Sequence, residues 1–121
     1  LAHHGDVDVG VAWRGLKGLL AEGELVWLRL RGRGTAWVNA FGAIERVEVP
    51  PGEEVAIDNF HFVAMSGDAE YRISRIGGLK TRLAGDEGLV LRVKGPATLY
   101  LQTRMLPELA RLLAPYMPRR R

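Results

Sequence analysis

Hydrophobic and polar residues alternate along most of this 121-residue chain, which is the pattern of half-buried β-strands. The alternation is clear in residues 7–13, in residues 26–39 and on both sides of the turn sequence Pro50-Pro51-Gly52. Further strand patterns flank the turns at residues 66–68 and 95–96. About nine short strands separated by turns predict an all-β sandwich or closed barrel.

The C-terminal region departs from this alternation. In residues 105–117 leucines recur at spacings of three and four, which predicts a helix, and Pro107 stands near its start, where helices tolerate proline. We expect this helix to lie against the β core, with residues 118–121 as a basic tail beyond it.

Two stretches of the chain, residues 15–39 and 78–102, align with each other without a gap. The identical pairs include Leu28 with Leu91, Arg29 with Arg92, and Thr35 with Thr98. This similarity indicates a duplication within one β domain that covers residues 1–121. Each copy is predicted to form a loop followed by a hairpin, which turns at residues 32–34 in the first copy and at residues 95–96 in the second.

The alternation also assigns two faces to each copy of the repeat. One face is apolar, and we expect it to form the core. The opposite face carries an arginine, a threonine, an aromatic residue and an amide in both copies, which predicts a subunit interface rather than a solvated surface. The candidate interface residues are Arg29, Thr35, Trp37 and Asn39 in the first copy, and Arg92, Thr98, Tyr100 and Gln102 in the second.

The sequences GGLKTRLAGDEGLVLRVKGPATLYLQTR and PPGEEVAIDNFHFVAM resemble a mitochondrial-biogenesis family whose eukaryotic member is called altered inheritance of mitochondria protein 24. The resemblance runs from about Gly15 to Arg104. It implies a fold similar to the tryptophan RNA-binding attenuation protein, a short double-stranded β-helix barrel of duplicated units that assembles as a trimer. Members of the family are commonly longer than this chain. The family has no established catalytic residues that could be carried over.

Asp58, Asn59 and His61 form a polar group that could carry chemistry. An aspartate beside a histidine could bind a metal, or could act as a general base with its orienting carboxylate. The alternative is a turn in which these side chains bond to the backbone. We favour the turn because neither a second histidine nor a cysteine accompanies His61, whereas structural zinc sites usually have four such ligands. No catalytic, cofactor-binding or metal-binding residue is predicted.

Arg29, Arg31 and Arg33 share a predicted hairpin with Trp27 and Trp37, a combination that could bind phosphates and stack bases. Arginine stems that cover aromatic rings at a subunit contact would give the same pattern. The formal net charge of +3 equals the charge of the three terminal arginines, so the rest of the chain is neutral overall. Nucleic-acid binding is therefore a secondary hypothesis.

The absence of cysteine and of long apolar runs excludes disulfide-rich and helical membrane proteins. Cysteine is absent, so the chain has no disulfide framework, and no apolar run is long enough to span a membrane. We expect a cytoplasmic protein without a signal sequence, and the scarcity of Asn and Gln suggests a thermophilic source.

The leading hypothesis is a non-enzymatic homo-oligomer, expected to be trimeric, that serves as a scaffold or binding module without a cofactor. The second hypothesis is a ring that binds RNA or other single-stranded nucleic acid. The third is a small-ligand, metal or hydrolytic site at Asp58 and His61.

Overall fold

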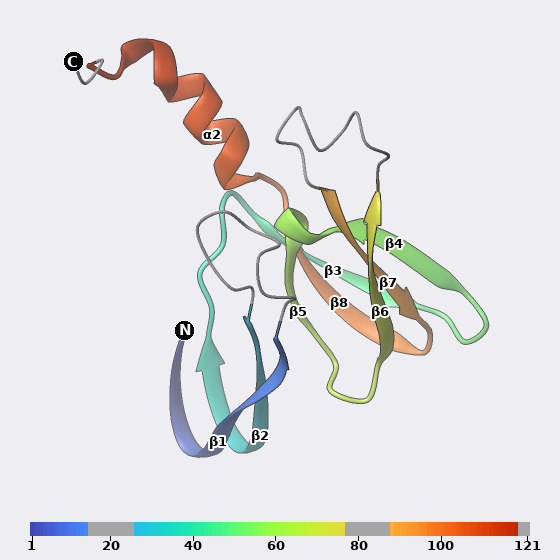
Figure 1. Cartoon of the computed structure of the whole chain (residues 1–121). Helices are drawn as coiled ribbons and strands as arrows, with labels where there is room; N and C mark the ends of the chain where they lie inside the picture. The colour runs from blue at the N-terminus through green and yellow to red at the C-terminus, as the bar shows by residue number, and fades with distance from the viewer. Residues whose placement is uncertain (15–25, 77–87, 119–121) are drawn as a thin grey trace. The chain divides into compact units, whose positions relative to one another are not determined.

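The computed structural model describes residues 1–14, 26–76 and 88–118, which are mostly β-strand with a single α-helix near the C-terminus (Figure 1). The strands are β1 (Ala2–Arg14), β2 (Val26–Trp37), β3 (Ile44–Val49), β4 (Glu54–Asp58), β5 (Phe62–Met65), β6 (Glu70–Ile76), β7 (Gly88–Lys94) and β8 (Ala97–Gln102). The helical elements are η1 (Asn59–His61), α2 (Leu106–Leu113) and η2 (Ala114–Tyr116). The predicted class, all-β with one C-terminal helix, is confirmed.

The chain divides into two compact units, where the sequence predicted one domain. Unit 1 covers Leu1–Asn39 and contains β1 and β2, and unit 2 covers Ala40–Arg121 and contains the other elements. The loop that opens each copy of the repeat lies outside the described residues. The strands that follow these loops are described in both copies.

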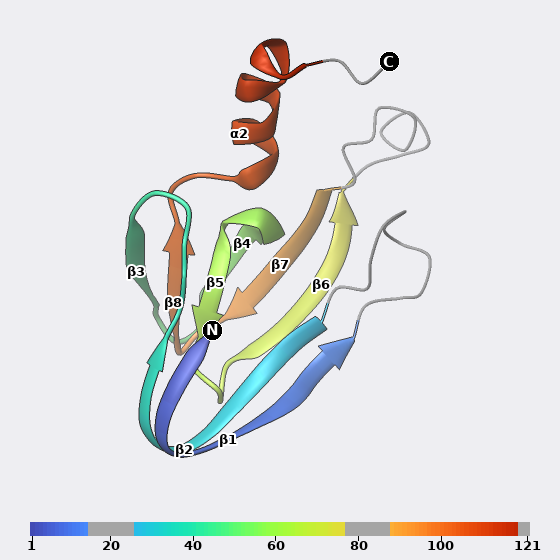
Figure 2. The same cartoon turned by 90° about the vertical axis from the view of Figure 1, so that its left-hand side faces the viewer.

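The described residues of unit 1 form a two-stranded antiparallel ribbon. β1 pairs with β2 from Ala2 opposite Trp37 to Arg14 opposite Val26, and the ribbon bends sharply near its middle (Figure 2). The bend requires glycine, because Gly32 has a φ of 125° and a Cβ at this position would collide with the carbonyl oxygen of Asp6. β2 therefore runs through the bend as one strand paired with β1. The prediction of a hairpin turning at residues 32–34 is wrong.

Unit 2 contains two three-stranded antiparallel sheets, with strand orders β3–β8–β5 and β4–β7–β6. The chain passes from β7 to β8 at residues 95–96, so these two strands reverse direction but belong to different sheets (Figure 2). The prediction that they form a hairpin is therefore also wrong. Gly95 packs so tightly against Pro50 that a Cβ would collide with the proline carbonyl oxygen, and its N–H donates to the carbonyl oxygen of Glu53 at 2.9 Å.

Alternate residues of β7 and β8 build the core of unit 2. Leu91, Val93 and Leu99 each have 0% of their surface exposed. Because successive side chains of a strand point to opposite faces, these residues fill the space between the two sheets. Other buried apolar residues of this unit are Val49, Ile57, Val90 and Ala97. The predicted core face is thus confirmed for Leu91, Val93 and Leu99 of the second copy, whereas Leu28 and Leu30 of the first copy are exposed.

The C-terminal helix forms where its leucine spacing predicts it. α2 starts after Met105 with Pro107 in its first turn, where the missing N–H costs no hydrogen bond. Three of its leucines are exposed, however, with 41% of Leu109, 67% of Leu112 and 47% of Leu113 accessible. The expectation that these side chains pack on the β core is therefore wrong. Neither α2 nor any other helix in the described part of the chain is long and apolar enough to span a membrane.

Candidate interface on the repeated strands

The structure places the predicted interface residues on β2 and just after it in unit 1, and on β7 and β8 in unit 2. In unit 1, Arg29, Thr35, Trp37 and Asn39 are all exposed, and Trp37 has 55% of its surface accessible. In unit 2 the corresponding polar residues contact β3, β4 and the segments beside them. The two copies of the face therefore have different surroundings.

Arg92 on β7 contacts a carboxylate from the neighbouring strand β4. Its Nη1 donates to Oε1 of Glu54 at 3.3 Å, and Arg72 on β6 donates to the same oxygen at 3.1 Å. Desolvation acts to raise the pKa of Glu54, but the hydrogen bonds from Arg72 and Arg92 outweigh it and hold that pKa below its usual range. Glu54 thus links all three strands of its sheet.

Thr98 on β8 makes the matching contact with β3. Its hydroxyl donates to Oε2 of Glu48 at 2.9 Å, and the two residues lie directly opposite each other in the strand register. Nε of Arg46 donates to the other oxygen of Glu48 at 2.7 Å. The hydrogen bond from Thr98, followed by that from Arg46, holds the pKa of Glu48 below its usual range.

Gln102 connects β8 to two other segments. Its Oε1 accepts the backbone N–H of Phe41 at 3.0 Å, and its Nε2 donates to the carbonyl oxygen of Phe60 at 2.6 Å. The aromatic residue of this copy, Tyr100, has 37% of its surface exposed. The polar side chains of the second copy are therefore used within unit 2.

Asp58, Asn59 and His61 lie at η1, where side chains bond to nearby backbone. Oδ1 of Asp58 accepts the N–H of Phe60 at 2.9 Å and caps the short helix. Nδ1 of His61 lies 2.7 Å from the carbonyl oxygen of Gln102. Within residues 1–14, 26–76 and 88–118, no group of three or more His, Cys, Asp or Glu residues could hold a metal ion. These contacts are those of a structural turn.

The strand pairings show that the correspondence between the copies extends beyond the aligned repeat. Leu30 and Val93 are aligned in the repeat. Leu30 pairs with Val9 in unit 1, and Val93 pairs with Tyr71 in unit 2. At the other end of the ribbon, Ala2 pairs with Trp37 as Ala64 pairs with Tyr100. β1 therefore corresponds to β5 followed by β6.

Sequence reasoning missed this correspondence because the spacing changes by one residue between the two parts of the repeat. Leu30 and Val93 differ by 63 positions, whereas Val9 and Tyr71 differ by 62. The signal that could have revealed it is the dipeptide Gly5-Asp6, which recurs as residues 67–68.

Among the described residues of unit 1, no strand corresponds to β3 or β4. In unit 2, β7 lies between β4 and β6, and β8 lies between β3 and β5, so both strands are paired along both edges. Among the described residues, β2 pairs with β1 alone. One edge of β2 is thus uncovered where the corresponding edge of β7 and β8 is covered.

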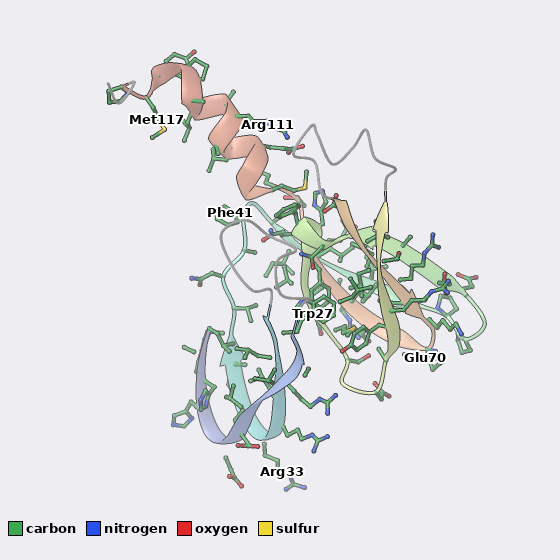
Figure 3. The ribbon with its side chains drawn as sticks, in the orientation of Figure 1. Trp27, Arg33, Phe41, Glu70, Arg111 and Met117 are labelled. Carbon is green, nitrogen blue, oxygen red and sulfur yellow. The ribbon has the colours of Figure 1, made fainter. Side chains whose placement is uncertain are left out.

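The absence of a third strand changes the environment of otherwise equivalent residues. Leu28 has 51% of its surface exposed, whereas its counterpart Leu91 has 0%. Arg31 lies opposite Asp8 in the ribbon, and Arg33 lies opposite Asp6 near the bend (Figure 3). Arg29 lies opposite Gly10, which offers no carboxylate.

The arrangement of strands can now be set beside known proteins. A family model described as Mitochondrial biogenesis AIM24 matches residues 1–104, which run through all eight described strands to two residues beyond β8. The chain belongs to the AIM24 family. The resemblance inferred from the sequence is therefore confirmed, while the likeness to the tryptophan RNA-binding attenuation protein stays a prediction.

Two relatives of this AIM24 chain come from Streptococcus pyogenes. An uncharacterised protein of serotype M6 is 31% identical over 97 residues, which are 80% of this chain and 39% of the relative. A crystal structure from the Northeast Structural Genomics Consortium matches 95% of this chain and 50% of its own chain, with 29% identity and a TM-score of 0.78. The chain thus spans half or less of the length of these relatives.

Proposed function

We propose that this AIM24 protein is a non-enzymatic homo-oligomer that acts as a scaffold or binding module, and that its subunits associate through unit 1. The observation that carries the proposal is the exposure of Leu28 and Trp37 on a two-stranded ribbon. Two strands alone form a marginally stable structure in water, and a third strand or a packing partner is generally needed. A subunit contact would supply that partner. A trimer is the stoichiometry that the family resemblance implies.

The duplication of an ancestral ribbon belongs to the same proposal. It is supported by the paired strand registers of Val9 with Leu30 and of Tyr71 with Val93. In this view unit 2 is the completed form of the ribbon, and unit 1 is the form that is completed by association.

Size-exclusion chromatography with multi-angle light scattering tests the proposal. We expect a mass three times that of the chain at micromolar concentration, and Trp37→Ala should shift the protein towards the monomer because it removes an exposed aromatic anchor. Tyr116→Ala is the matched control, since Tyr116 is an aromatic residue with 85% exposure on η2, outside the repeat. A monomeric native protein at these concentrations would refute the proposal.

A second candidate function is the binding of single-stranded nucleic acid. It is favoured by the three exposed arginines of β2, Arg29, Arg31 and Arg33, which share the strand with the exposed ring of Trp37. Fluorescence anisotropy with a labelled single-stranded RNA should then show affinity that falls with added salt and falls again in Arg29→Ala and Arg31→Ala. Salt-independent or undetectable binding would remove this candidate.

A ligand or metal site at Asp58 and His61 is not part of the proposal. Both side chains already bond to backbone groups of η1 and β8. His61→Ala should accordingly lower the stability of unit 2 and leave any binding activity of unit 1 unchanged.

A further inference from the structure

The uncovered edge of β2 is the feature of the molecule that the proposed function leaves unexplained. Alternate residues of a strand direct their N–H and C=O groups to opposite sides, so this edge presents a row of hydrogen-bonding groups. Exposed edges of this kind readily pair with another strand. The question is which strand fits this edge.

Unit 2 shows what covers the same edge in the second copy of the repeat. There β3 pairs with β8, β4 pairs with β7, and the turn at residues 50–52 follows the bend at Gly95. The covering segment is thus a bent strand pair that can follow a glycine bend. β2 also bends at a glycine, Gly32, which aligns with Gly95 in the repeat.

The two side chains that hold the covering segment in unit 2 have identical counterparts in the first copy of the repeat. Arg92 binds Glu54 of β4, and Thr98 binds Glu48 of β3. Their counterparts on β2 are Arg29 and Thr35, two residues identical in the repeat. Among the described residues, neither of these counterparts has an ion pair or side-chain hydrogen bond to a carboxylate. β2 therefore carries an arginine and a threonine that are able to bind glutamates, but no glutamate is bound to them in the described structure.

β2 and the segment that forms β3 and β4 carry complementary charges. β2 contains three arginines and no acidic residue, as its sequence VWLRLRGRGTAW shows. Residues 44–58, which form β3, β4 and their connecting turn, contain five acidic residues and one arginine. Glu48 keeps 59% of its side chain exposed and Glu54 keeps 27%, so both can accept further hydrogen bonds.

β3 and β4 are themselves edge strands of their sheets in the described structure. We infer that the uncovered edge of β2 pairs with the outer edge of β3 and β4 from a second copy of this chain, with Arg29 facing Glu54 and Thr35 facing Glu48. This inference rests on the proposed function, and it specifies which strands form the contact between subunits. Because the two edges that pair are different, the contact is head-to-tail, and it closes a ring when the rotation between successive subunits closes. The trimer of the proposed function would be such a ring.

A matched pair of variants on β2 tests the contact. The counterpart of Arg31 is Lys94, which bonds to Glu70 of β6 at 3.3 Å, and Asp8 stands in the place of Glu70 opposite Arg31. Arg31 therefore has a carboxylate of its own ribbon opposite it in the strand register, whereas Arg29 lies opposite Gly10. Arg29→Gln and Arg31→Gln remove the same charge from the same strand, but only the first removes a group that faces the second copy.

Sedimentation velocity over a dilution series gives the self-association constant of each full-length variant. We expect Arg29→Gln to weaken association by about tenfold, as for loss of a hydrogen bond to a charged group, and Arg31→Gln to weaken it by less than about twofold. Far-UV circular dichroism confirms that both variants are folded. Equal effects of the two variants in a self-associating protein would overturn the inference and leave the proposed oligomer standing.

Hydrogen exchange of the native chain provides a second measurement that needs no substitution. On concentration from monomer to oligomer, alternate amides of β2 and the outer amides of β3 and β4 should become protected together. Protection of β2 without β3 and β4 would show a different partner strand and overturn the inference. A protein that stays monomeric throughout would overturn the inference and the proposed function together.

A synthetic peptide of residues 44–58 offers a direct probe of the acidic strand. The fluorescently labelled peptide should bind the native chain more tightly than a version with Glu48→Gln and Glu54→Gln, and this preference should disappear with the Arg29→Gln chain. Equal binding of the two peptides would contradict the assigned role of the glutamates.

Discussion

β2 of unit 1 and the pair β7 and β8 of unit 2 share a sequence pattern but occupy different environments. Leu28 and Leu91 hold the same place in the repeat, yet the first has 51% of its surface exposed and the second 0%. The difference comes from β3 and β4, which cover an edge in unit 2 and have no counterpart among the strands described in unit 1. Alternation along a strand thus defines its faces, while neighbouring strands decide which face is buried.

The two units also differ in what crowds their bends. Gly32 and Gly95 both stand where a backbone carbonyl approaches too closely for a Cβ, but this carbonyl belongs to Asp6 of the paired strand β1 at Gly32 and to Pro50, between β3 and β4, at Gly95. Each glycine is therefore required by a neighbouring segment and not by the bend alone. The burial of the side chains on either side depends on the number of strands in the ribbon.

The largest expected effect is on the free energy of unfolding after truncation of the equivalent leucines. Leu91→Ala should cost about 2–5 kcal/mol because it leaves a cavity in a packed core. Leu28→Ala should cost less than about 1 kcal/mol at concentrations where the protein is monomeric, since its side chain is largely exposed there. Urea unfolding followed by circular dichroism measures both values.

Raising the protein concentration sharpens this comparison. If a second copy covers unit 1, the cost of Leu28→Ala should grow with concentration while that of Leu91→Ala should not. Similar costs for the two variants in the monomer would mean that unit 1 already buries Leu28, contrary to the structure.

Much of the secondary structure follows from local sequence. The alternating pattern at residues 44–58 predicted β3, β4 and the turn between them, and the leucine spacing predicted α2. The hairpins were predicted wrongly because a glycine such as Gly32 or Gly95 is compatible with two arrangements. The chain can turn back to pair with itself, or it can bend and continue beside other strands. Which strand pairs with which depends on residues far apart in the chain, and glycine carries no information about them.

The interface residues show the same limit. The face with Arg92, Thr98 and Gln102 was predicted as a subunit contact, yet in unit 2 it binds β3, β4 and their neighbours. The partners of these residues lie 38, 50 and 42 positions away along the chain, so periodicity alone could not identify them. The prediction for Arg29, Thr35, Trp37 and Asn39 stays open, because their side chains are exposed in the described structure.

A smaller effect is expected from the amides that end each copy of the face. Gln102→Ala should destabilise unit 2 by about 1–2 kcal/mol, because the Phe41 N–H and the Phe60 carbonyl oxygen both lose a hydrogen bond. Asn39→Ala should change the free energy of unfolding by less than about 0.5 kcal/mol, as expected for an exposed residue. Thermal and urea unfolding of both variants check this difference. Equal destabilisation would imply that Asn39 has an equivalent role in unit 1.

The smallest effect concerns the acidic strand and is seen as a dependence of stability on pH. The pKa of Glu54 is lowered in the folded state, where the hydrogen bonds from Arg72 and Arg92 outweigh desolvation. Its contribution to stability is therefore complete above the unfolded pKa, about 4.3, and is lost as the pH falls through the folded value. Glu54→Gln should lower the free energy of unfolding at neutral pH and lose this difference in acid.

Glu53→Gln is the control for this measurement, because Glu53 is exposed and forms no ion pair among the described residues. Urea unfolding of the native chain and both variants between neutral pH and about pH 3 covers the range in which glutamates titrate. A difference between Glu54→Gln and the native chain that persists unchanged in acid would show that Glu54 stabilises β4 through its shape rather than its charge. The same loss in Glu53→Gln would place the effect in the net charge of the segment, since removing either carboxylate changes that charge equally.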